Sequence, residues 1–468
     1  MGISLNPAGL LNGQGIDVNS LVNQILSQKT GQLMQWQNEQ STLQSQAGLL
    51  TNINSDLTNL ANAVNALADP LGALTAQAAS SSDPSVLTAT AQTSAVAGVH
   101  QIVVTNLATA GTIYTGALAD GNTSFLASGV TSGNITLQVG GNAGASHSIA
   151  IAVGSNDTLS TLAGYINQQG WGVTASVVTD ATGARLALYS QAMGTTGSLA
   201  ITSNDTTLSF SAPSGGTNAS LTIDGIPYSS ASNTITGAIP GLTLNLAGAA
   251  PNEAVQLTVG LDTAQASQAI NTFVSAYNQV MQDINGQFTV NAATNAEGPL
   301  GSDTSLRSLQ TSLMSDITYA ISGNSGLVNL ESLGINMNND GTLTMGTNAN
   351  GQTVDEVLAA NPTAFQNFFQ NASATGFANN FHADLLNLTD TTQGILYVDL
   401  AQNKAQQQSL SDSISNFEDQ LAVQQKQLTD QFSKLNASLQ AYPLLLQQVT
   451  DTLAVLDSSN GSNTGSSH

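Results

Sequence analysis

The sequence has no cysteine and few charged residues. Only 7% of its 468 residues are charged, against about a quarter in ordinary globular proteins. Lysine and arginine together number 6 and aspartate and glutamate 29, so the formal net charge is −23. A chain with this charge repels nucleic-acid phosphates and anionic lipid, so we expect neither as a partner. The absence of cysteine excludes disulfides, thiolate metal sites and thiol nucleophiles.

The sequence also lacks long apolar runs. No run approaches the roughly 18 to 20 apolar residues of a membrane-spanning helix, so we expect no membrane insertion. The opening stretch MGISLNPAGLLNGQG has no basic residue, and the first lysine is Lys29. No secretory signal peptide is therefore predicted. Any export is expected to follow a route without a cleaved signal.

The N-terminal part of the chain is predicted to be a long helix. Residues 1–16 are rich in Gly and Asn and are expected to be disordered. Asp17 is placed to cap a helix that runs to Asp69, where Pro70 ends it. Two apolar rows with heptad spacing lie in its second half, as in a coiled coil: Leu43, Leu50, Leu57 and Val64, and Ile53, Leu60 and Leu67. The same register upstream passes through polar residues, namely Lys29, Gln32 and Glu39, which predicts a weaker and partly mobile surface.

The C-terminal part of the chain carries the clearest helical pattern. One row, called here the C-terminal row, keeps heptad spacing over seven positions: Ile414, Leu421, Leu428, Leu435, Tyr442, Val449 and Leu456. Other apolar residues flank this row, first on one side and then on the other: Leu410 and Phe417, then Phe432, Leu439, Leu446 and Leu453. Pro443 is expected to kink the helix or split it in two. Because neither terminal helix buries its rows alone, we predict that the two ends pair and that the rows also contact other subunits or partners.

Between these ends the pattern changes to short strands. Alternating β-branched runs such as SVLTATA, HQIVVTNLA, NITLQVGG, SIAIAVG, GVTASVV and RLALYS predict β-rich modules. DTLSTLAGYINQQ predicts one helix among them. The predicted fold class is α+β, with a coiled-coil leg and a helical body that carries inserted β-rich modules.

This pattern divides the chain into seven predicted segments. They are a disordered start (1–16), an N-terminal helical leg (17–69), a β part of the helical body (70–110), inserted β-rich plate modules (111–262, with an insert at about 131–202), the second half of the helical body (263–400), a C-terminal coiled-coil leg (401–457) and a flexible tail (458–468).

No pattern of catalytic or metal-binding residues is evident. The four histidines, His100, His147, His382 and His468, lack the spacing of metal sites and are interpreted as structural or surface residues. No G-x-S-x-G elbow, phosphate-binding loop or glycosidase-like carboxylate pair is found. NMNNDGTLTMGT resembles the opening of a calcium loop, but its twelfth position is Thr347, so a hairpin turn at Asp340-Gly341 is favoured. We predict no enzyme activity, no cofactor and no metal.

Eight stretches in order resemble one family, the bacterial flagellar filament cap proteins, also called flagellar hook-associated protein 2. GQGIDVNSLVNQIL resembles the family's start, and SSSDPSVLTATAQTSAVAGVHQIVVTNLATA its next segment. NDTLSTLAGYINQQGWGVTASVVTDATGARLALYSQAMGTTG is similar to a β module shared with flagellins. LTIDGIPYSSASNTITGAIPGLTLNL, INTFVSAYNQVMQDI, GPLGSDTSLRSLQ, SLGINMNNDGTL and NPTAFQNFF follow in the family's order.

The resemblance implies an extracellular protein at the distal tip of the flagellum, exported by the flagellar type III route. It implies a ring of several copies that guides flagellin into the growing filament. Implied partners are other copies, flagellin, the hook–filament junction proteins and an export chaperone. Two features depart from the family: the terminal helices carry Gln, Asn and Ser where many Lys, Arg and Glu are usual, and Pro443 is unexpected. The alternative function is a surface adhesin whose β modules bind glycans.

Overall fold

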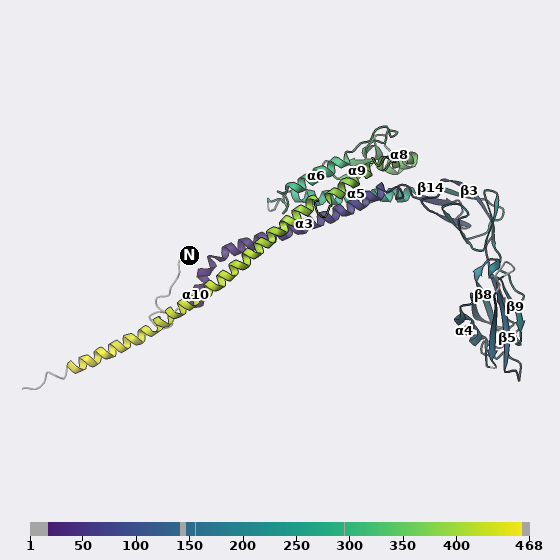
Figure 1. Cartoon of the computed structure of the whole chain (residues 1–468), viewed down its shortest axis with the longest axis horizontal. Helices are drawn as coiled ribbons and strands as arrows, with labels where there is room; N and C mark the ends of the chain where they lie inside the picture. The colour runs from purple at the N-terminus through teal and green to yellow at the C-terminus, as the bar shows by residue number, and fades with distance from the viewer. Residues whose placement is uncertain (1–16, 141–146, 155, 294, 461–468) are drawn as a thin grey trace, which may run out of the picture. The chain divides into compact units, whose positions relative to one another are not determined.

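The computed structural model describes residues 17–140, 147–154, 156–293 and 295–460 (Figure 1). Side chains are described over the same ranges except 147–150 and 457–460. The expectations for residues 1–16 and for the end of the tail therefore lie outside the described residues. Two compact units divide the chain. The helical unit comprises Met1–Asn65, Asn271–Thr353 and Ala372–His468, and the β-rich unit comprises Ala66–Ile270 and Val354–Asn371.

The helical unit is built from long helices that are contributed by both ends of the chain and by its middle. They are α2 (Val18–Ser27), α3 (Thr30–Ala68), α5 (Thr263–Phe288), α6 (Thr304–Ile317), α9 (Phe377–Leu388) and α10 (Ile395–Asn460). Every third or fourth residue of α3 is buried: Leu50, Ile53, Leu57, Leu60 and Val64. On the far side of the unit, Phe273 and Tyr277 of α5 cluster with Phe377 and Phe381 of α9. The predicted α+β fold with long paired terminal helices is confirmed.

The helix predicted over residues 17–69 is divided in two. Asp17 caps α2 as expected, since its carboxylate accepts a hydrogen bond from the Ser20 amide at 3.1 Å. The break follows Ser27, where the hydroxyl groups of Ser27 and Thr30 donate to the backbone carbonyls of Gln24 and Ser27. Serine and threonine hydroxyls compete with the helical ladder for these carbonyls. The sequence analysis did not weigh this local competition, and the prediction of one continuous helix was wrong.

Helix α10 continues through Pro443. Proline removes one amide donor and crowds the preceding turn, but the helix regains its ladder on both sides of the residue. The predicted split into two helices was therefore wrong. The helix ends at Asn460, three residues beyond the position where a flexible tail was expected to start.

One module of the β-rich unit is a pair of antiparallel sheets around an aliphatic core. The strand orders are β1-β14-β3-β10-β11 and β12-β13-β2. The strands are β1 (Gln77–Ser81), β2 (Leu87–Ala91), β3 (Gly98–Asn106), β10 (Ala219–Ile223), β11 (Ile226–Ser230), β12 (Thr234–Thr236), β13 (Leu242–Leu246) and β14 (Val255–Leu261). Ile102, Val104, Leu221, Leu244 and Leu257 fill the space between the sheets. Strands on either side of residues 107–218 therefore share one core.

Residues between β3 and β10 form the second module. Its sheets have the orders β4-β8-β7 and β6-β5-β9, and helix α4 packs against β7 and β8. The elements are β4 (Ala110–Tyr114), β5 (Ser132–Val139), β6 (His147–Gly154), α4 (Leu159–Gln169), β7 (Val173–Asp180), β8 (Gly183–Met193) and β9 (Leu199–Asn204). Thr158 caps α4 through a capping box with Thr161, and Asp157 supports it by accepting from the Thr161 hydroxyl.

The remaining short elements complete each unit. In the β-rich unit, α7 (Val354–Ala360) and α8 (Pro362–Phe369) pack together, with Phe368 and Phe369 in edge-to-face contact. In the helical unit, β15 (Ile335–Met337) and β16 (Leu343–Met345) form a hairpin. The hairpin turn predicted at Asp340-Gly341 is present, although only Gly341 adopts a positive φ.

Candidate functional site: the paired terminal helices

The N-terminal helices lie antiparallel along α10. Asn403 of α10 donates to Gln46 of α3, and Gln407 donates to the Leu43 carbonyl one turn later. Further along, Trp36 meets Phe417 edge to face. Residue numbers fall along α3 as they rise along α10, so the two helices keep one register over more than four turns.

The pairing continues past the break between α2 and α3. The Lys29 ammonium donates to the side-chain oxygen of Gln424 at 2.9 Å, and α2 packs against α10 with Val22 and Leu26 buried. The upstream half of the N-terminal leg was expected to be the weaker surface. Apolar residues of α2 nevertheless find a partner on α10 within the same chain.

The predicted packing residues fall into three groups by burial. Six residues of the N-terminal rows, which are Leu50, Ile53, Leu57, Leu60, Val64 and Leu67, are buried, and Ile414 of α10 is 9% exposed. An intermediate group is partly buried, namely Leu43, Phe417, Leu421, Leu428, Phe432 and Leu439. The last group is exposed: Leu435 (47%), Tyr442 (65%), Leu446 (59%) and Val449 (53%).

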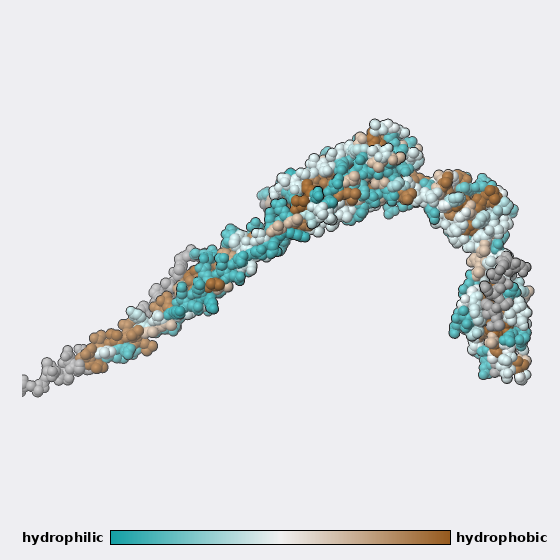
Figure 2. All heavy atoms as spheres, viewed as in Figure 1, coloured by the Kyte–Doolittle hydropathy of each residue, from teal (hydrophilic) through white to brown (hydrophobic). Residues whose placement is uncertain are grey.

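The last four turns of α10 therefore present an apolar surface with no described partner in this chain. Leu444, Leu445, Leu453, Val455 and Leu456 are also exposed there. Figure 2 shows hydrophobic residues gathered along this end of the helix, beyond a stretch that is mostly hydrophilic. Leu444, Leu445 and Val455 were not among the predicted packing residues, because they lie off the heptad row.

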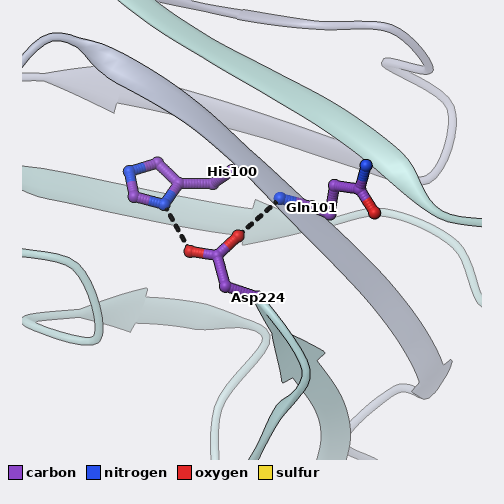
Figure 3. Close-up of polar contacts among 3 residues, drawn as sticks. All are labelled: His100, Gln101 and Asp224. Carbon is purple, nitrogen blue, oxygen red and sulfur yellow. Dashed lines mark hydrogen bonds and ion pairs between the residues drawn. The ribbon is translucent and has the colours of Figure 1, made fainter.

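His100 forms the ion pair that the sequence analysis missed. Its Nδ1 lies 2.7 Å from Oδ2 of Asp224, and the Gln101 amide donates to Oδ1 at 2.8 Å (Figure 3). The hydrogen bond from His100 holds the pKa of Asp224 below its usual range, with help from the Gln101 amide. Asp224 and Gly225 both have positive φ, as a two-residue type I′ hairpin requires. The pair fastens the β10–β11 turn to β3, which is a structural role.

The structure places the other histidines apart from any donor cluster. His382 of α9 is partly buried, and burial lowers the pKa of its ring. The side chain of His147 and all of His468 lie outside the described residues. Within the part of the chain that is described, no three histidine, aspartate or glutamate side chains gather as metal ligands. In the same residues, no helix is both long and apolar enough to span a bilayer.

Comparison with known proteins gives one consistent result. The model of the flagellar hook-associated protein 2 N-terminus matches residues 14–111, and that of its C-terminus matches residues 216–442. The B-type flagellar hook-associated protein 2 of Pseudomonas aeruginosa is 30% identical over 96% of this chain and 97% of its own length. The chain belongs to the flagellar hook-associated protein 2 family.

Other members of the family support the assignment. Flagellar hook-associated protein 2 of Escherichia coli K12 is 26% identical over 67% of this chain and 70% of its own length. The crystal structure of the D1-D2-D3 domains of the flagellar cap protein FliD from Escherichia coli matches with a TM-score of 0.55 at 26% identity. That match covers 76% of this chain and 99% of the other. The flagellin hook IN motif matches residues 134–192, which lie in the module that contains α4.

Membership in the flagellar hook-associated protein 2 family confirms the function at the level of the family. The chain is a flagellar filament cap protein of the flagellum tip. The family is structural and not enzymatic, in agreement with the prediction. Membership also implies partners in flagellar assembly. The C-terminal family match ends at Tyr442, so the exposed apolar end of α10 lies largely beyond it.

Proposed function

We propose that several copies of this chain form a ring on the growing filament, which guides arriving flagellin subunits into place. Residues 17–69 and 401–457 act as the leg, residues 70–110 and 263–400 as the body, and residues 111–262 as the plate. The proposed partners are other copies of the chain, flagellin, the hook–filament junction proteins and, before assembly, a type III export chaperone. The chemistry is non-covalent packing throughout.

The observation that carries this proposal is the change in burial along the C-terminal row. Ile414 is buried within the chain, whereas Tyr442, Leu446 and Val449 are exposed on the same row of the same helix. Complete burial of a leucine or valine side chain stabilises a complex by about 1.5–3 kcal/mol, as an upper estimate. A heptad row that has no partner in its own chain fits a helix of another subunit or of flagellin.

A genetic complementation experiment tests the proposal. A strain deleted for this gene would be complemented with the wild-type gene or with a Leu446→Gln/Val449→Gln gene. Glutamine is a good helix former and is already common on α10, so the substitution removes the apolar contact and keeps the helix. We expect the variant to restore few filaments, with flagellin lost to the medium as monomer.

The control is Val423→Gln on the same helix. Val423 is also exposed but lies off the C-terminal row, so this variant should complement fully. Immunoblots of the secreted variants would confirm equal export. Full filament length with the double variant would contradict a role for the row. Normal filaments with reduced attachment in the deleted strain itself would favour an adhesin.

A further inference from the structure

A pair of carboxyl groups faces across two helices of the helical unit. Asp316 of α6 and Asp384 of α9 are placed to share a hydrogen bond. Oδ2 of Asp316 is buried without a described partner, as is the hydroxyl of the fully buried Tyr277 on α5. Asp384 itself is exposed. Two carboxylates share one hydrogen bond only when one of them carries a proton.

The surroundings of the pair favour its protonated form. Burial raises the pKa of Asp316 to about 7, and the charge and hydrogen bond of Asp384 act in the same direction. Tyr277 faces the pair from α5, and burial together with the charge of Asp316 raises the pKa of its phenol. These groups supply no positive charge at neutral pH.

The nearest basic groups in sequence are engaged or uncharged. Arg307 of α6 donates to the Gly301 carbonyl and lies over the Phe288 ring. His382 of α9 has a pKa lowered by burial, so its ring is neutral at neutral pH. The chain has only six lysine and arginine residues, which leaves a proton as the simplest cation for this pair.

We propose that the Asp316–Asp384 pair is a proton-dependent clamp that joins α6 to α9 in mild acid and releases them toward neutral and alkaline pH. The clamp belongs to the chain itself and does not depend on which partners the chain binds. Below its working range the two side chains hold one proton and hydrogen-bond to each other. Above this range two carboxylates repel each other beside a buried hydroxyl.

A second carboxyl pair in the same unit acts in the same direction. Asp56 of α3 faces Asp283 of α5, and Gln279 also donates to Asp283. Burial raises the pKa of Asp56, and the hydrogen bond and charge of Asp283 add to the shift. Asp399 of α10 also has a pKa raised by burial. Mild acid therefore favours packing at several helix contacts of this unit.

The sign of the effect follows from proton linkage. A carboxyl whose folded pKa is raised binds more protons in the folded state than in the unfolded state. Its stabilisation is complete below the unfolded value, near 4, and is lost as pH rises toward the folded value. For Asp316 that window runs from about pH 4 to about pH 7. Below it, turn carboxylates with lowered pKa values, among them Asp340 and Asp390, lose their own stabilising hydrogen bonds.

Hydrogen exchange of the full chain tests the clamp. Peptides from α6 and α9 would be compared between wild type and Asp316→Asn at pH 7.5 and again at pH 5. Because the two proteins are compared at one pH, intrinsic exchange rates cancel. An asparagine amide donates to Asp384 at every pH, as the protonated acid does.

We expect α6 and α9 to exchange about tenfold more slowly in Asp316→Asn than in wild type at pH 7.5. This allows for solvent screening of a shift of several pKa units, each of which is tenfold. At pH 5 the two proteins should exchange alike. Asp384→Asn should give the same pattern, and its exposed position makes it the safer variant for folding. Asp430→Asn, an exposed carboxylate on α10, is the matched control and should change neither helix.

Two results would overturn the proposal. Equal exchange of α6 and α9 in wild type and both variants at pH 7.5 would show that the pair has no energetic effect. Millimolar calcium that slows exchange of wild type at pH 7.5, but not of Asp316→Asn, would show that a metal ion and not a proton joins the carboxylates.

Discussion

Trp36 of α3 and Phe417 of α10 meet edge to face, with ring centroids 5.4 Å apart and planes at 80°. This contact lies in the stretch of the N-terminal leg where the heptad register passes through polar residues. Two aromatic rings in this geometry contribute about 0.5–1.5 kcal/mol beyond the burial of their surface. One pair of rings thus supports pairing where the leucine rows do not reach.

Replacing Phe417 by alanine should loosen this part of the leg. The ring is only partly buried, so we expect a loss of about 2 kcal/mol, below the 3–5 kcal/mol of a fully buried phenylalanine. Hydrogen exchange of peptides spanning residues 30–42 should become faster, while α5 and α6 stay protected. Phe417→Leu keeps most of the apolar volume and should have a smaller effect. Unchanged exchange in the alanine variant would mean that the contact does not hold the helices together.

The paired helices could be predicted because a heptad row is a local signal. Leu50, Leu57 and Val64 repeat every seven residues, and the sequence alone shows that they need a partner. The break before Thr30 was missed because it depends on hydroxyl groups that bond to carbonyls three residues back. Exposure at the end of α10 was not predictable either, because the row continues there without change.

The sheets illustrate a different limit. Most strands were predicted from alternation, but β1 pairs with β14, which begins more than 170 residues later in the chain. Such pairing depends on the whole fold and not on local pattern. Asp316 and Asp384 are 68 residues apart and meet only because α6 and α9 pack together. No feature of either sequence neighbourhood indicates a shared proton.

The His100–Asp224 pair should make a small, pH-dependent contribution to the β-rich unit. Because the pKa of Asp224 is lowered, its stabilisation is present above the unfolded value near 4 and is lost as pH falls through the folded value. Asp224 is nearly half exposed, so we expect less than about 1 kcal/mol. Asp224→Asn keeps the left-handed turn and removes the charge. The difference in unfolding free energy from wild type should be measurable at pH 7 and vanish near pH 3, and a constant difference would exclude an ionic origin.

Gly183 and Gly164 should respond in opposite ways to alanine. A Cβ at Gly183 would lie 2.1 Å from the Leu118 carbonyl oxygen, at a φ of +127°. We expect Gly183→Ala to cost about 2–4 kcal/mol, because the side chain meets backbone that cannot move. Gly164 lies within α4 and a Cβ there meets nothing within 4 Å. Gly164→Ala should stabilise the module by about 0.5–1 kcal/mol.

These two glycine variants can be followed by fluorescence of Trp171, which packs against the core of this module. The chain has two tryptophans, so a Trp36→Phe background leaves Trp171 as the single reporter. Urea midpoints should move down for Gly183→Ala and up for Gly164→Ala. Equal midpoints would mean that the carbonyl of Leu118 shifts freely, and that the approach of β8 to this segment is not tightly fixed.

Pro443→Ala separates helix stability from assembly at the end of α10. The helix passes through Pro443, where the Leu439 carbonyl lacks its usual amide donor. Restoring the donor should stabilise this stretch by up to about 3 kcal/mol, so peptides spanning residues 436–450 should exchange more slowly. If the exposed row must bend to meet a partner, the same variant should form shorter filaments despite its more stable helix. Filaments of normal length with slower exchange would show that the row docks as a straight helix.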